Sequence, residues 1–595
     1  MPIPNRNILW SRVLVDELLK QSVDTACVAP GSRSTPLVTA LSEQPEIELF
    51  SQLDERCAGF FALGHASVRD KPVPLVSTSG TAAVNFHPAV VEAFHAHVPM
   101  LLLTADRPPV LQDSGANQTI DQAELYGSSV RWFQQLPEPE PDERKCSALR
   151  RQVAQAVSKS TGPPAGPVHL NVPFRKPLAP EETEDAQLEA FRSSHGEELP
   201  GAQEEPIRIS SSECTAKPGV VDDLATRMAQ VDRCCIVAGP YTGDDGDRRA
   251  VRRFVARHDV PLLADPLSGF RFGTGEGASQ VLGGYDGYAP VLAEETQGAP
   301  DLVVRVGANP TSKALTRALS ATNADQVLVN PSGDWTDDTF TATDLVTCDP
   351  EHFFPALDRE LDAFSVDRAW NERLFSAERA CWREVEDHRT DRELEAAYVM
   401  QVLERIPDPA DLFVSNSMPV RDLDRFGRPM EKDLRVFGNR GASGIDGIVS
   451  SALGVASGSE RELVLITGDL ALYHDMNGLV AISRFNLDAT IVVLNNDGGG
   501  IFHMLPIEDH DPPFSDYMKT PHGLDFSHAA DMYGLNYWQV EAGTAEFREV
   551  FDETLDTEGA HLINVMVDGE ESHRRREEVT DRIQSSAREA MQGNG

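Results

Sequence analysis

Long apolar runs are absent from this chain of 595 residues. None approaches the roughly 18 residues that a helix needs to span a bilayer, and the first ten residues lack the basic and apolar segments of a signal peptide. The eight cysteines show no C-x-x-C spacing and no His-rich neighbourhood, which argues against a zinc site or a disulfide framework. We therefore expect a cytoplasmic protein without a membrane segment.

Lysine is also scarce, with nine residues against 44 arginines, whereas aspartate and glutamate together number 94. The resulting net charge of −41 repels nucleic acid and anionic membranes, so neither is expected as a partner. An acidic, lysine-poor composition resembles that of proteins from salt-loving microorganisms, where concentrated salt screens the self-repulsion. Because the acids are spread throughout and apolar strands recur, we expect a globular halophilic enzyme rather than a disordered acidic chain.

Short apolar runs alternate with helical patterns, which predicts parallel α/β domains, and the length suggests about three of them. The predicted parts are 1–180, a linker at 181–217 rich in Glu, Ser and Pro, a central α/β domain at 218–370, a C-terminal domain at 371–568 and a polar tail at 569–595. Within the tail, His573–Met591 is a candidate for a solvated surface helix. Ligands of such sheets gather outside the carboxyl ends of the strands. Residues that follow the apolar runs are therefore the candidates for chemistry. The runs predicted to be strands are Thr25–Ala29, Val73–Ser77, Met100–Ala105, Val168–Val172, Cys234–Ala238, Pro261–Ala264, Leu302–Val306, Val327–Val329, Leu412–Ser415, Val436–Gly438, Leu463–Thr467, Thr490–Leu494 and Leu562–Val567.

Two predicted strands end in residues able to hold a phosphate-bound cation. Leu463–Thr467 is followed by Gly468 and Asp469, and Thr490–Leu494 is followed by Asn495 and Asn496. We expect these strands to be neighbours in the sheet. Their ends would then bring together carboxylate, amide and carbonyl oxygens, which are the ligands that Mg²⁺ prefers. An ordinary strand-end turn explains Gly-Asp alone, but it explains the pair at this spacing less readily.

This pair resembles the diphosphate-binding motif of thiamine-diphosphate-dependent enzymes. The resemblance implies that Gly468 helps to bind thiamine diphosphate and that Asp469, the Asn496 side chain and the Gly498 carbonyl hold Mg²⁺ or Mn²⁺. It also implies that Glu55 hydrogen-bonds the aminopyrimidine ring and activates the cofactor, although a lone glutamate also suits a solvated first helical turn. Ile445 would support the bent cofactor, with a core helix residue as the alternative.

Further motifs extend the resemblance from about residue 5 to residue 567. They are Pro30–Pro36, Thr104–Pro109, Gly115–Gln118, Asn416–Arg421 and Asn439–Gly447. Together they are similar to those of the 2-succinyl-5-enolpyruvyl-6-hydroxy-3-cyclohexene-1-carboxylate (SEPHCHC) synthase family of menaquinone biosynthesis.

The resemblance implies three doubly wound parallel-sheet domains, with a pyrimidine-binding domain at 1–180 and a diphosphate-binding domain at 371–568. The implied activity is that of a transferase. It decarboxylates 2-oxoglutarate and adds the succinyl semialdehyde unit in a 1,4 sense to isochorismate, releasing CO₂. A homodimer or homotetramer is also implied, in which Glu55 and the diphosphate site come from different subunits.

Both implied substrates are dicarboxylates, so the pocket must locally reverse the field of an acidic protein, and the arginine fork suits this task. The resemblance assigns Ser32, Arg33, Arg107, Asn117 and Gln118 to isochorismate, with Gln118 also a catalytic candidate, and assigns Ser417, Arg421 and Arg440 to the succinyl donor. A surface salt bridge is the alternative for each arginine taken singly.

A weaker motif in the central domain departs from the family pattern. Lys313 matches the first residue of a Lys-Arg pair in the family, but Ala314 takes the place of the arginine. Arg317, about one helical turn further on, is the candidate substitute for the missing guanidinium. The resemblance therefore adds Lys313 to the substrate-binding residues.

Two other interpretations remain open at this point. Another thiamine-diphosphate enzyme, similar to acetolactate synthase or a 2-oxo acid decarboxylase, would use short mono-anionic substrates and need fewer arginines. A non-catalytic relative would have no reason to retain Glu55, Asp469 and Asn496 together. A nicotinamide dehydrogenase is disfavoured, because no G-x-G-x-x-G follows an early strand.

Overall fold

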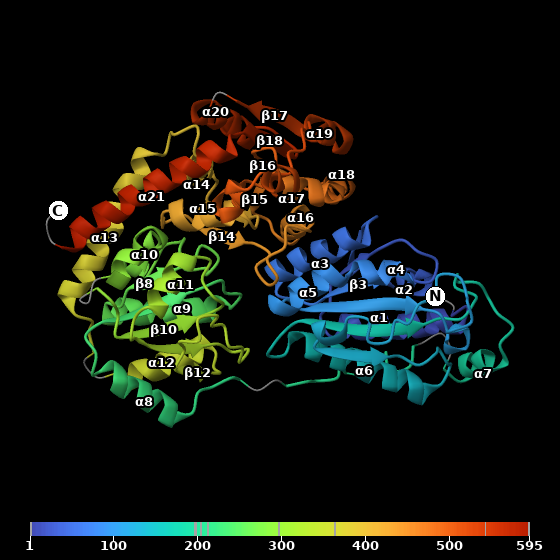
Figure 1. The fold of residues 1–595 in the computed structure, drawn as a ribbon. Helices are drawn as coiled ribbons and strands as arrows, with labels where there is room; N and C mark the ends of the chain where they lie inside the picture. The colour runs from blue at the N-terminus through green and yellow to red at the C-terminus, as the bar shows by residue number, and fades with distance from the viewer. Residues whose placement is uncertain are drawn as a thin grey trace. The chain divides into compact units, whose positions relative to one another are not determined.

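The computed structural model describes residues 3–195, 199–202, 205–210, 213–294, 298–361, 364–541 and 543–592. The chain forms two compact units. The first comprises 1–211, 439–460 and 475–487, and the second comprises 212–438, 461–474 and 488–595. Three six-stranded sheets carry the fold, and neighbouring strands in each run parallel (Figure 1). The predicted parallel α/β architecture is confirmed.

The sheet of the first unit is built on four fully buried apolar strands. Its order is β2 (Glu48–Ser51), β1 (Thr25–Val28), β3 (Val73–Ser77), β4 (Met100–Asp106), β6 (Pro167–Pro173), β5 (Trp132–Gln135). The helices of this unit are α1 (Arg6–Lys20), α2 (Thr35–Ser42), α3 (Glu55–Arg69), α4 (Thr81–Asn85), α5 (His87–His95), α6 (Glu143–Thr161), α7 (Ala186–His195), α16 (Ile448–Gly458) and α18 (Val480–Phe485). Strands β1, β3, β4 and β6 are buried along their whole length, as central strands of a helix-covered parallel sheet should be.

The second unit contains a central sheet ordered β12 (Asp344–Val346), β11 (Asp325–Val329), β10 (Leu302–Val306), β7 (Cys234–Ala238), β8 (Leu262–Ala264), β9 (Val281–Leu282). Its helices are α8 (Pro218–Met228), α9 (Asp245–His258), α10 (Tyr285–Glu294), α11 (Lys313–Ser320), α12 (Pro350–Glu360) and α13 (Arg368–Asp387). This strand order is that of dinucleotide-binding sheets, in which the helix after the first strand receives a phosphate. Here that helix, α9, begins among Asp244, Asp245 and Asp247, whose carboxylates oppose an anion at this end.

The third sheet, also in the second unit, positions the candidate cofactor motif. Its order is β14 (Leu434–Phe437), β13 (Ala410–Val414), β15 (Glu462–Gly468), β16 (Thr490–Asn495), β18 (His561–Met566), β17 (Asn536–Val540). The helices are α14 (Glu395–Arg405), α15 (Met418–Phe426), α17 (Asp469–His474), α19 (Ser527–Tyr533), α20 (Thr544–Leu555) and α21 (Gly569–Met591). Strands β15 and β16 pair directly, with Gly468 opposite Leu494. The prediction that the strands preceding Asp469 and Asn496 are neighbours is therefore confirmed.

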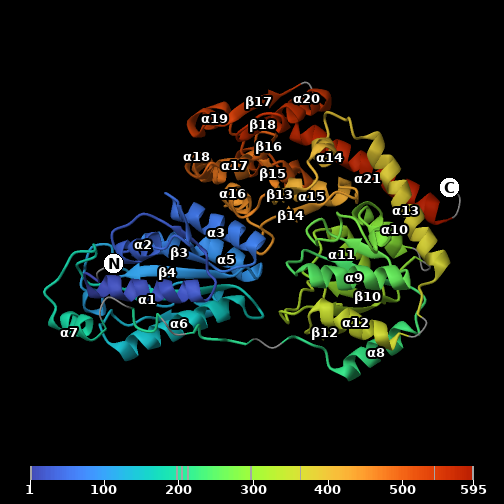
Figure 2. The ribbon, with the colours of Figure 1, turned by 180° about the vertical axis from the view of Figure 1, so that it is seen from behind.

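The helix predicted in the polar tail forms, but it is more buried than expected. The segment expected to be a solvated tail forms α21, which buries Arg576, Val579, Ile583 and Ala587 and runs alongside α13 in both views (Figures 1 and 2). A helix needs an inward residue only at every third or fourth position. The charged residues between these positions make the segment polar overall, so its composition alone does not reveal the buried face.

Part of the predicted linker is also ordered. It contains α7, whose Leu188 and Phe191 are buried in the core of the first unit. Two apolar residues one helical turn apart are enough to dock a short helix, although they do not alter the polar composition of the segment.

All eight cysteines are free thiols, and all except Cys214 are buried. Cys234 and Cys235 lie in the buried strand β7, as the apolar run predicted. Within the described ranges, no helix combines the length and apolar character that crossing a membrane requires.

Helices α3 and α16 pack closely through glycines, although they lie far apart in the sequence. A Cβ atom at Gly64 of α3 would stand 1.9 Å from the Ser451 carbonyl oxygen of α16, and one at Gly454 of α16 would stand 2.1 Å from the Phe61 carbonyl oxygen. Both contacts are with backbone atoms, which cannot swing away. The two helices can therefore approach this closely only with glycine at these positions.

Gly64→Ala should force α3 and α16 apart and destabilise the first unit by about 1–3 kcal/mol, as overpacking in cores generally does. Urea unfolding in molar KCl would measure this change. Gly219→Ala is the control, because a Cβ there meets no atom within 4 Å. Equal unfolding midpoints for the two variants would contradict the packing described.

Candidate active site

In the first unit, the turn after β3 gathers side chains from several strand ends. Gln118 Nε2 donates to the Ser79 carbonyl at 2.9 Å, and the Ser79 hydroxyl donates to the Gln118 carbonyl at 3.1 Å. Arg107, which follows β4, donates to the Ser79 hydroxyl oxygen. The structure thus brings together two predicted residues, Arg107 and Gln118, around Ser79, which sequence reasoning missed. The sequence feature that could have indicated Ser79 is the run of small and hydroxyl residues that follows a buried strand.

Arg33 joins this group from the turn after β1. Its backbone N–H donates to Thr78 Oγ1 at 3.2 Å, and its guanidinium donates to the Phe174 carbonyl at 2.8 Å. Burial lowers the pKa of Arg33, and the nearby charge of Arg107 lowers it further. Two guanidiniums close enough to repel each other provide a place for a dianion. Ser32 is exposed beside Arg33, and Asn117 is exposed beside Gln118.

A buried amide relay fixes these strand ends. The Gly80 N–H donates to Gln122 Oε1 at 2.9 Å, Gln122 Nε2 donates to Asn171 Oδ1 at 2.9 Å, and Asn171 Nδ2 donates to Asp106 Oδ2 at 2.8 Å. Asp106 also accepts from the Arg107 N–H at 2.6 Å. A relay of satisfied buried polar groups is rigid, so it fixes the position of the Ser79 turn relative to Arg107. Sequence reasoning identified neither Gln122 nor Asn171.

The glycine-rich run that carries Arg440 and Ile445 is held by a buried glutamate of α5. Glu92 accepts from the N–H groups of Gly441 at 2.6 Å and Ala442 at 2.7 Å. Burial raises the pKa of Glu92, and these backbone bonds partly oppose that rise. The backbone on which Arg440 and Ile445 stand is therefore fixed, while both side chains remain partly exposed.

Glu55 is the first residue of α3, and it is half-buried. The preceding residue, Asp54, caps the helix by accepting from the N–H groups of Arg56 and Cys57. Because the cap is made by Asp54, the Glu55 carboxylate is not needed to satisfy the helix end. That leaves it available for a ligand.

In the second unit, Asp469 and Gly498 meet at the ends of β15 and β16. Asp469 Oδ2 accepts from the Gly498 N–H at 2.9 Å and lies 3.2 Å from His522 Nε2. Burial raises the pKa of Asp469, and the hydrogen bonds oppose the rise. Gly498 has φ +139°, and a Cβ there would lie 2.0 Å from the Lys519 carbonyl oxygen, so only glycine fits. Sequence reasoning missed His522.

Asn496 presents one oxygen that has no partner. Its Nδ2 donates to Glu395 Oε1 at 2.7 Å, whereas its buried Oδ1 has no hydrogen-bond partner within the described part of the chain. An unpaired buried acceptor costs free energy unless a ligand satisfies it. With the Asp469 carboxylate and the backbone of Gly498, it makes a donor set suited to a hard cation. The described residues contain no cluster of three or more His, Cys, Asp or Glu side chains that could hold a metal.

Helix α15 carries the two predicted donor-site residues of this unit. Ser417 precedes the helix with φ +72°, a strained conformation for a residue other than glycine and one that persists mainly at functional sites. The Arg421 guanidinium donates to the Ser417 carbonyl. The structure therefore brings Ser417 and Arg421 together at the carboxyl end of β13.

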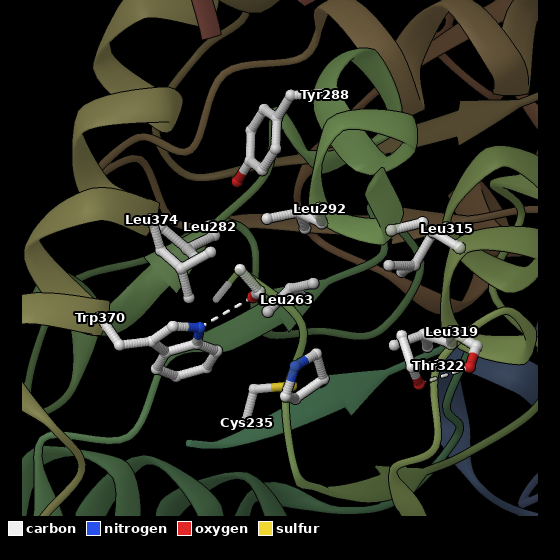
Figure 3. A pocket seen from close by; sticks show the side chains of 14 residues that line it. Cys235, Leu263, Leu282, Tyr288, Leu292, Leu315, Leu319, Thr322, Trp370 and Leu374 are labelled. Atoms are coloured by element: carbon white, nitrogen blue, oxygen red, sulfur yellow. Dashed lines mark hydrogen bonds between the residues drawn. The ribbon is translucent and has the colours of Figure 1, made fainter. Parts of the chain in front are cut away.

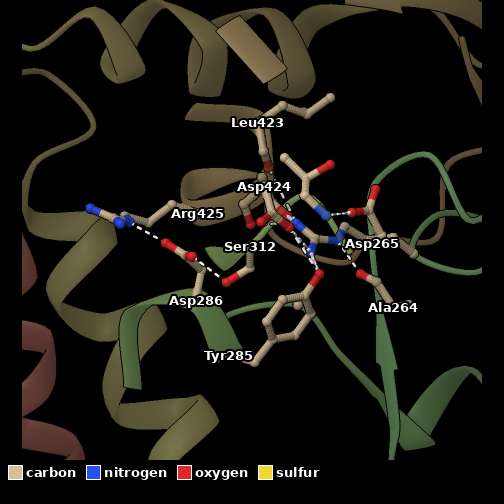
Figure 4. A network of polar contacts seen from close by, with 12 residues as sticks. Ala264, Asp265, Tyr285, Asp286, Ser312, Leu423, Asp424 and Arg425 are labelled. Carbon is tan, nitrogen blue, oxygen red and sulfur yellow. Dashed lines mark hydrogen bonds and ion pairs between the residues drawn. The ribbon is translucent and has the colours of Figure 1, made fainter. Parts of the chain in front are cut away.

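Buried polar contacts join α15 to the start of α11, where Lys313 lies (Figure 4). Asp286 accepts from the hydroxyl of Ser312, the N-cap of α11, and pairs with Arg425 of α15. The fully buried Arg271 donates to Asp424 Oδ1 at 2.8 Å. Lys313 is the first residue of α11 and is exposed, so its backbone is fixed relative to α15 while its amine stays free to move.

An enclosed cavity in the central sheet is not a substrate site. It measures about 20 Å³ and is lined mainly by apolar side chains, including Leu263, Leu292 and Leu374 (Figure 3). The Trp370 indole N–H beside it already donates to the Gly298 carbonyl at 2.8 Å. A space of this size holds about one water molecule, so it excludes a dicarboxylate.

Two known families match the parts of the chain that contain these two groups of residues. A family described as "Thiamine pyrophosphate enzyme, N-terminal TPP binding domain" matches residues 10–125, which include Glu55, Arg33 and Arg107. A second, "Thiamine pyrophosphate enzyme, C-terminal TPP binding domain", matches residues 422–565, which include Asp469 and Asn496. The fold and these matches define a thiamine-pyrophosphate enzyme.

Individual relatives indicate a particular family within this class of enzymes. The chain is 48% identical to the 2-succinyl-5-enolpyruvyl-6-hydroxy-3-cyclohexene-1-carboxylate synthase of Haloarcula marismortui, over 98% of this chain and 99% of the relative. It is 47% identical to that of Halobacterium salinarum over 98% and 99%, and 44% identical to that of Roseiflexus castenholzii over 95% and 97%. The chain belongs to this family of synthases, as the motif resemblance predicted.

Glu92→Gln should loosen the 439–447 run, because an amide replaces one of the two accepting oxygens with a donor. Losing one such bond costs about 1–2 kcal/mol, which corresponds to roughly tenfold faster hydrogen exchange at Gly441 or Ala442. Hydrogen–deuterium exchange measures this directly. Glu17→Gln is the matched control, since Glu17 is another buried carboxylate of the first unit, bonded to Gln21 and Arg150. Unchanged exchange in the Glu92 variant would rule out this anchoring role.

Proposed function

We propose that this chain catalyses the reaction for which its relatives are named. It would decarboxylate 2-oxoglutarate and add the resulting succinyl semialdehyde unit in a 1,4 sense to isochorismate, giving SEPHCHC and CO₂ in menaquinone biosynthesis. The observation that carries the proposal is the convergence of Arg33, Arg107 and Gln118 on one turn of a thiamine-pyrophosphate enzyme whose net charge is −41. Such a local positive charge in so acidic a chain is explained by a dicarboxylate ligand.

Thiamine diphosphate, when bound, supplies the nucleophilic carbon and the electron sink that decarboxylation and carbon transfer need. Gly468, Asp469, Asn496 Oδ1 and the Gly498 carbonyl would hold its diphosphate through Mg²⁺ or Mn²⁺, as the unpaired oxygen of Asn496 supports. Glu55 would hold the proton shared with the pyrimidine ring, and Ile445 would support the bent cofactor.

The residues proposed for each substrate are those that the resemblance to the synthase family implies. Ser417, Arg421 and Arg440 would bind the carboxylates of 2-oxoglutarate. Ser32, Arg33, Arg107, Asn117 and Lys313 would bind isochorismate, and Gln118 would orient its ring or deliver a proton. The Gln118 amide is held through Ser79, which fixes its position without a charge.

We propose in addition that the protein works as a homodimer or homotetramer in the cytoplasm. The domain bounds 1–180, 218–370 and 371–568 remain part of this proposal, since they follow the family pattern. The free state of all eight cysteines supports a reducing compartment, where thiols stay unpaired.

The test is turnover by the purified chain with thiamine diphosphate and Mg²⁺ in molar KCl. We expect CO₂ release from 2-oxoglutarate and a single adduct when isochorismate is present. Turnover of pyruvate without any use of 2-oxoglutarate would favour the acetolactate synthase-like alternative. A lack of any thermal stabilisation by saturating cofactor and Mg²⁺, which ligand linkage otherwise requires, would favour a non-catalytic relative.

Alanine substitutions separate the two substrates. Arg421→Ala should raise KM for 2-oxoglutarate and Arg107→Ala should raise KM for isochorismate, each by about 10–100-fold, since a hydrogen bond to a charged group is worth roughly 1.5–3 kcal/mol. Arg253→Ala is the control, because Arg253 is an exposed arginine near Glu276. Equal effects of all three substitutions on both substrates would refute the assignment.

A further inference from the structure

The first turns of α21 reach the candidate metal ligand Asn496 through buried charges. Arg576 of α21 donates from Nε to Asp422 Oδ1 at 2.8 Å and from Nη2 to Asp422 Oδ2 at 2.9 Å. The same Nη2 donates to Glu395 Oε2 at 3.2 Å, and Ser572 Oγ accepts from the Glu395 backbone N–H at 3.1 Å. Arg576, Asp422 and Glu395 are all buried. One guanidinium therefore bridges the start of α14 and the middle of α15.

The other oxygen of Glu395 decides how Asn496 is oriented. Glu395 Oε1 accepts from Asn496 Nδ2 at 2.7 Å. An ionised carboxylate can only accept hydrogen bonds, so Asn496 must turn its amino group toward Glu395. Its Oδ1 then faces the other way, buried and without a hydrogen-bond partner within the described residues.

We propose that Glu395 and Arg576 are positioning residues that fix the Asn496 amide with its oxygen, rather than its nitrogen, directed to the divalent cation of the cofactor. This inference rests on the proposed function, because it requires a cation at Asn496. The same guanidinium holds Asp422, the neighbour of Arg421 in α15. Helix α21 thereby sets both the metal ligand and the helix that carries the donor-site arginine.

Glu395→Gln tests the orientation directly. Arg576 is a donor, so it retains the oxygen of the new amide and leaves the new NH₂ group facing Asn496. Asn496 can then satisfy that donor only by turning its own oxygen toward it, which directs its NH₂ group to the metal. An amide NH₂ group cannot ligate a cation. The variant keeps the shape of the side chain and reverses the orientation of Asn496.

The measurement is the affinity of the full chain for Mn²⁺ in the presence of thiamine diphosphate, followed through the electron paramagnetic resonance signal of free Mn²⁺. We expect Glu395→Gln to weaken Mn²⁺ binding by about 10–100-fold, the usual effect of losing a group that orients a ligand. Glu378→Gln is the matched control. Glu378 is a buried carboxylate of the same unit that accepts from Gly283, Gly284, Tyr288 and Trp382, and its variant should keep the wild-type Mn²⁺ affinity.

A double variant distinguishes a reversed Asn496 amide from a misfolded protein. Adding Asn496→Asp to Glu395→Gln places a carboxylate opposite the new NH₂ group, so that one oxygen accepts from it and the other remains for the metal. We expect this double variant to recover most of the lost affinity, which a misfolded protein could not do. Wild-type affinity in Glu395→Gln, equal losses in the Glu378 control, or no recovery in the double variant would each overturn the proposal. Failure of the wild-type protein to bind Mn²⁺ would instead contradict the proposed function itself.

Discussion

Three ion pairs of α15 are the constraint on which the second unit depends. Asp422 pairs with Arg576 of α21, Asp424 pairs with Arg271 of the loop between β8 and β9, and Arg425 pairs with Asp286 of α10. Removing one partner of a buried pair costs about 3–5 kcal/mol, because the other charge is left without compensation. One helix of nine residues is thus held from three directions. Arg421 lies on the same helix and Ser417 directly precedes it, so both are held in place by these pairs.

In the first unit, the strand ends that carry Arg33 and Arg107 are fixed by hydrogen bonds instead. The relay runs from the Gly80 N–H through the amides of Gln122 and Asn171 to the carboxylate of Asp106, and no ion pair within the described residues engages the guanidinium of Arg33 or Arg107. This difference has a chemical reason. An arginine that must bind a dianion cannot already be neutralised by the protein, whereas an arginine that holds helices together must be. In a chain with 94 acidic residues, keeping these two guanidiniums out of ion pairs is itself a constraint on the sequence.

The predictions from sequence succeeded where a pattern is local. Continuous apolar runs predicted the central strands of all three sheets, and the strand-end position of Asp469 and Asn496 followed from them. The strands that were missed, β2, β5, β9, β12 and β17, all lie at sheet edges. An edge strand is covered on fewer sides, so β5 and β17 mix polar with aromatic residues and show no apolar run. Glu395 and Arg576 lie 181 residues apart, and no local signal connects them, so their meeting with Asn496 was visible only in the fold. The same holds for Asn171 and His522.

The central claim is that the fold presents three oxygens, from Asp469, Asn496 and Gly498, to one cation. The most direct measurement is a crystal structure of the complex with thiamine diphosphate and Mn²⁺, with the metal located by its anomalous scattering. We expect Mn²⁺ to be ligated by the Asp469 carboxylate, Asn496 Oδ1 and the Gly498 carbonyl, with Asn496 Nδ2 still bonded to Glu395. A metal bound elsewhere, or ligated through His522 in place of Asn496, would contradict the account.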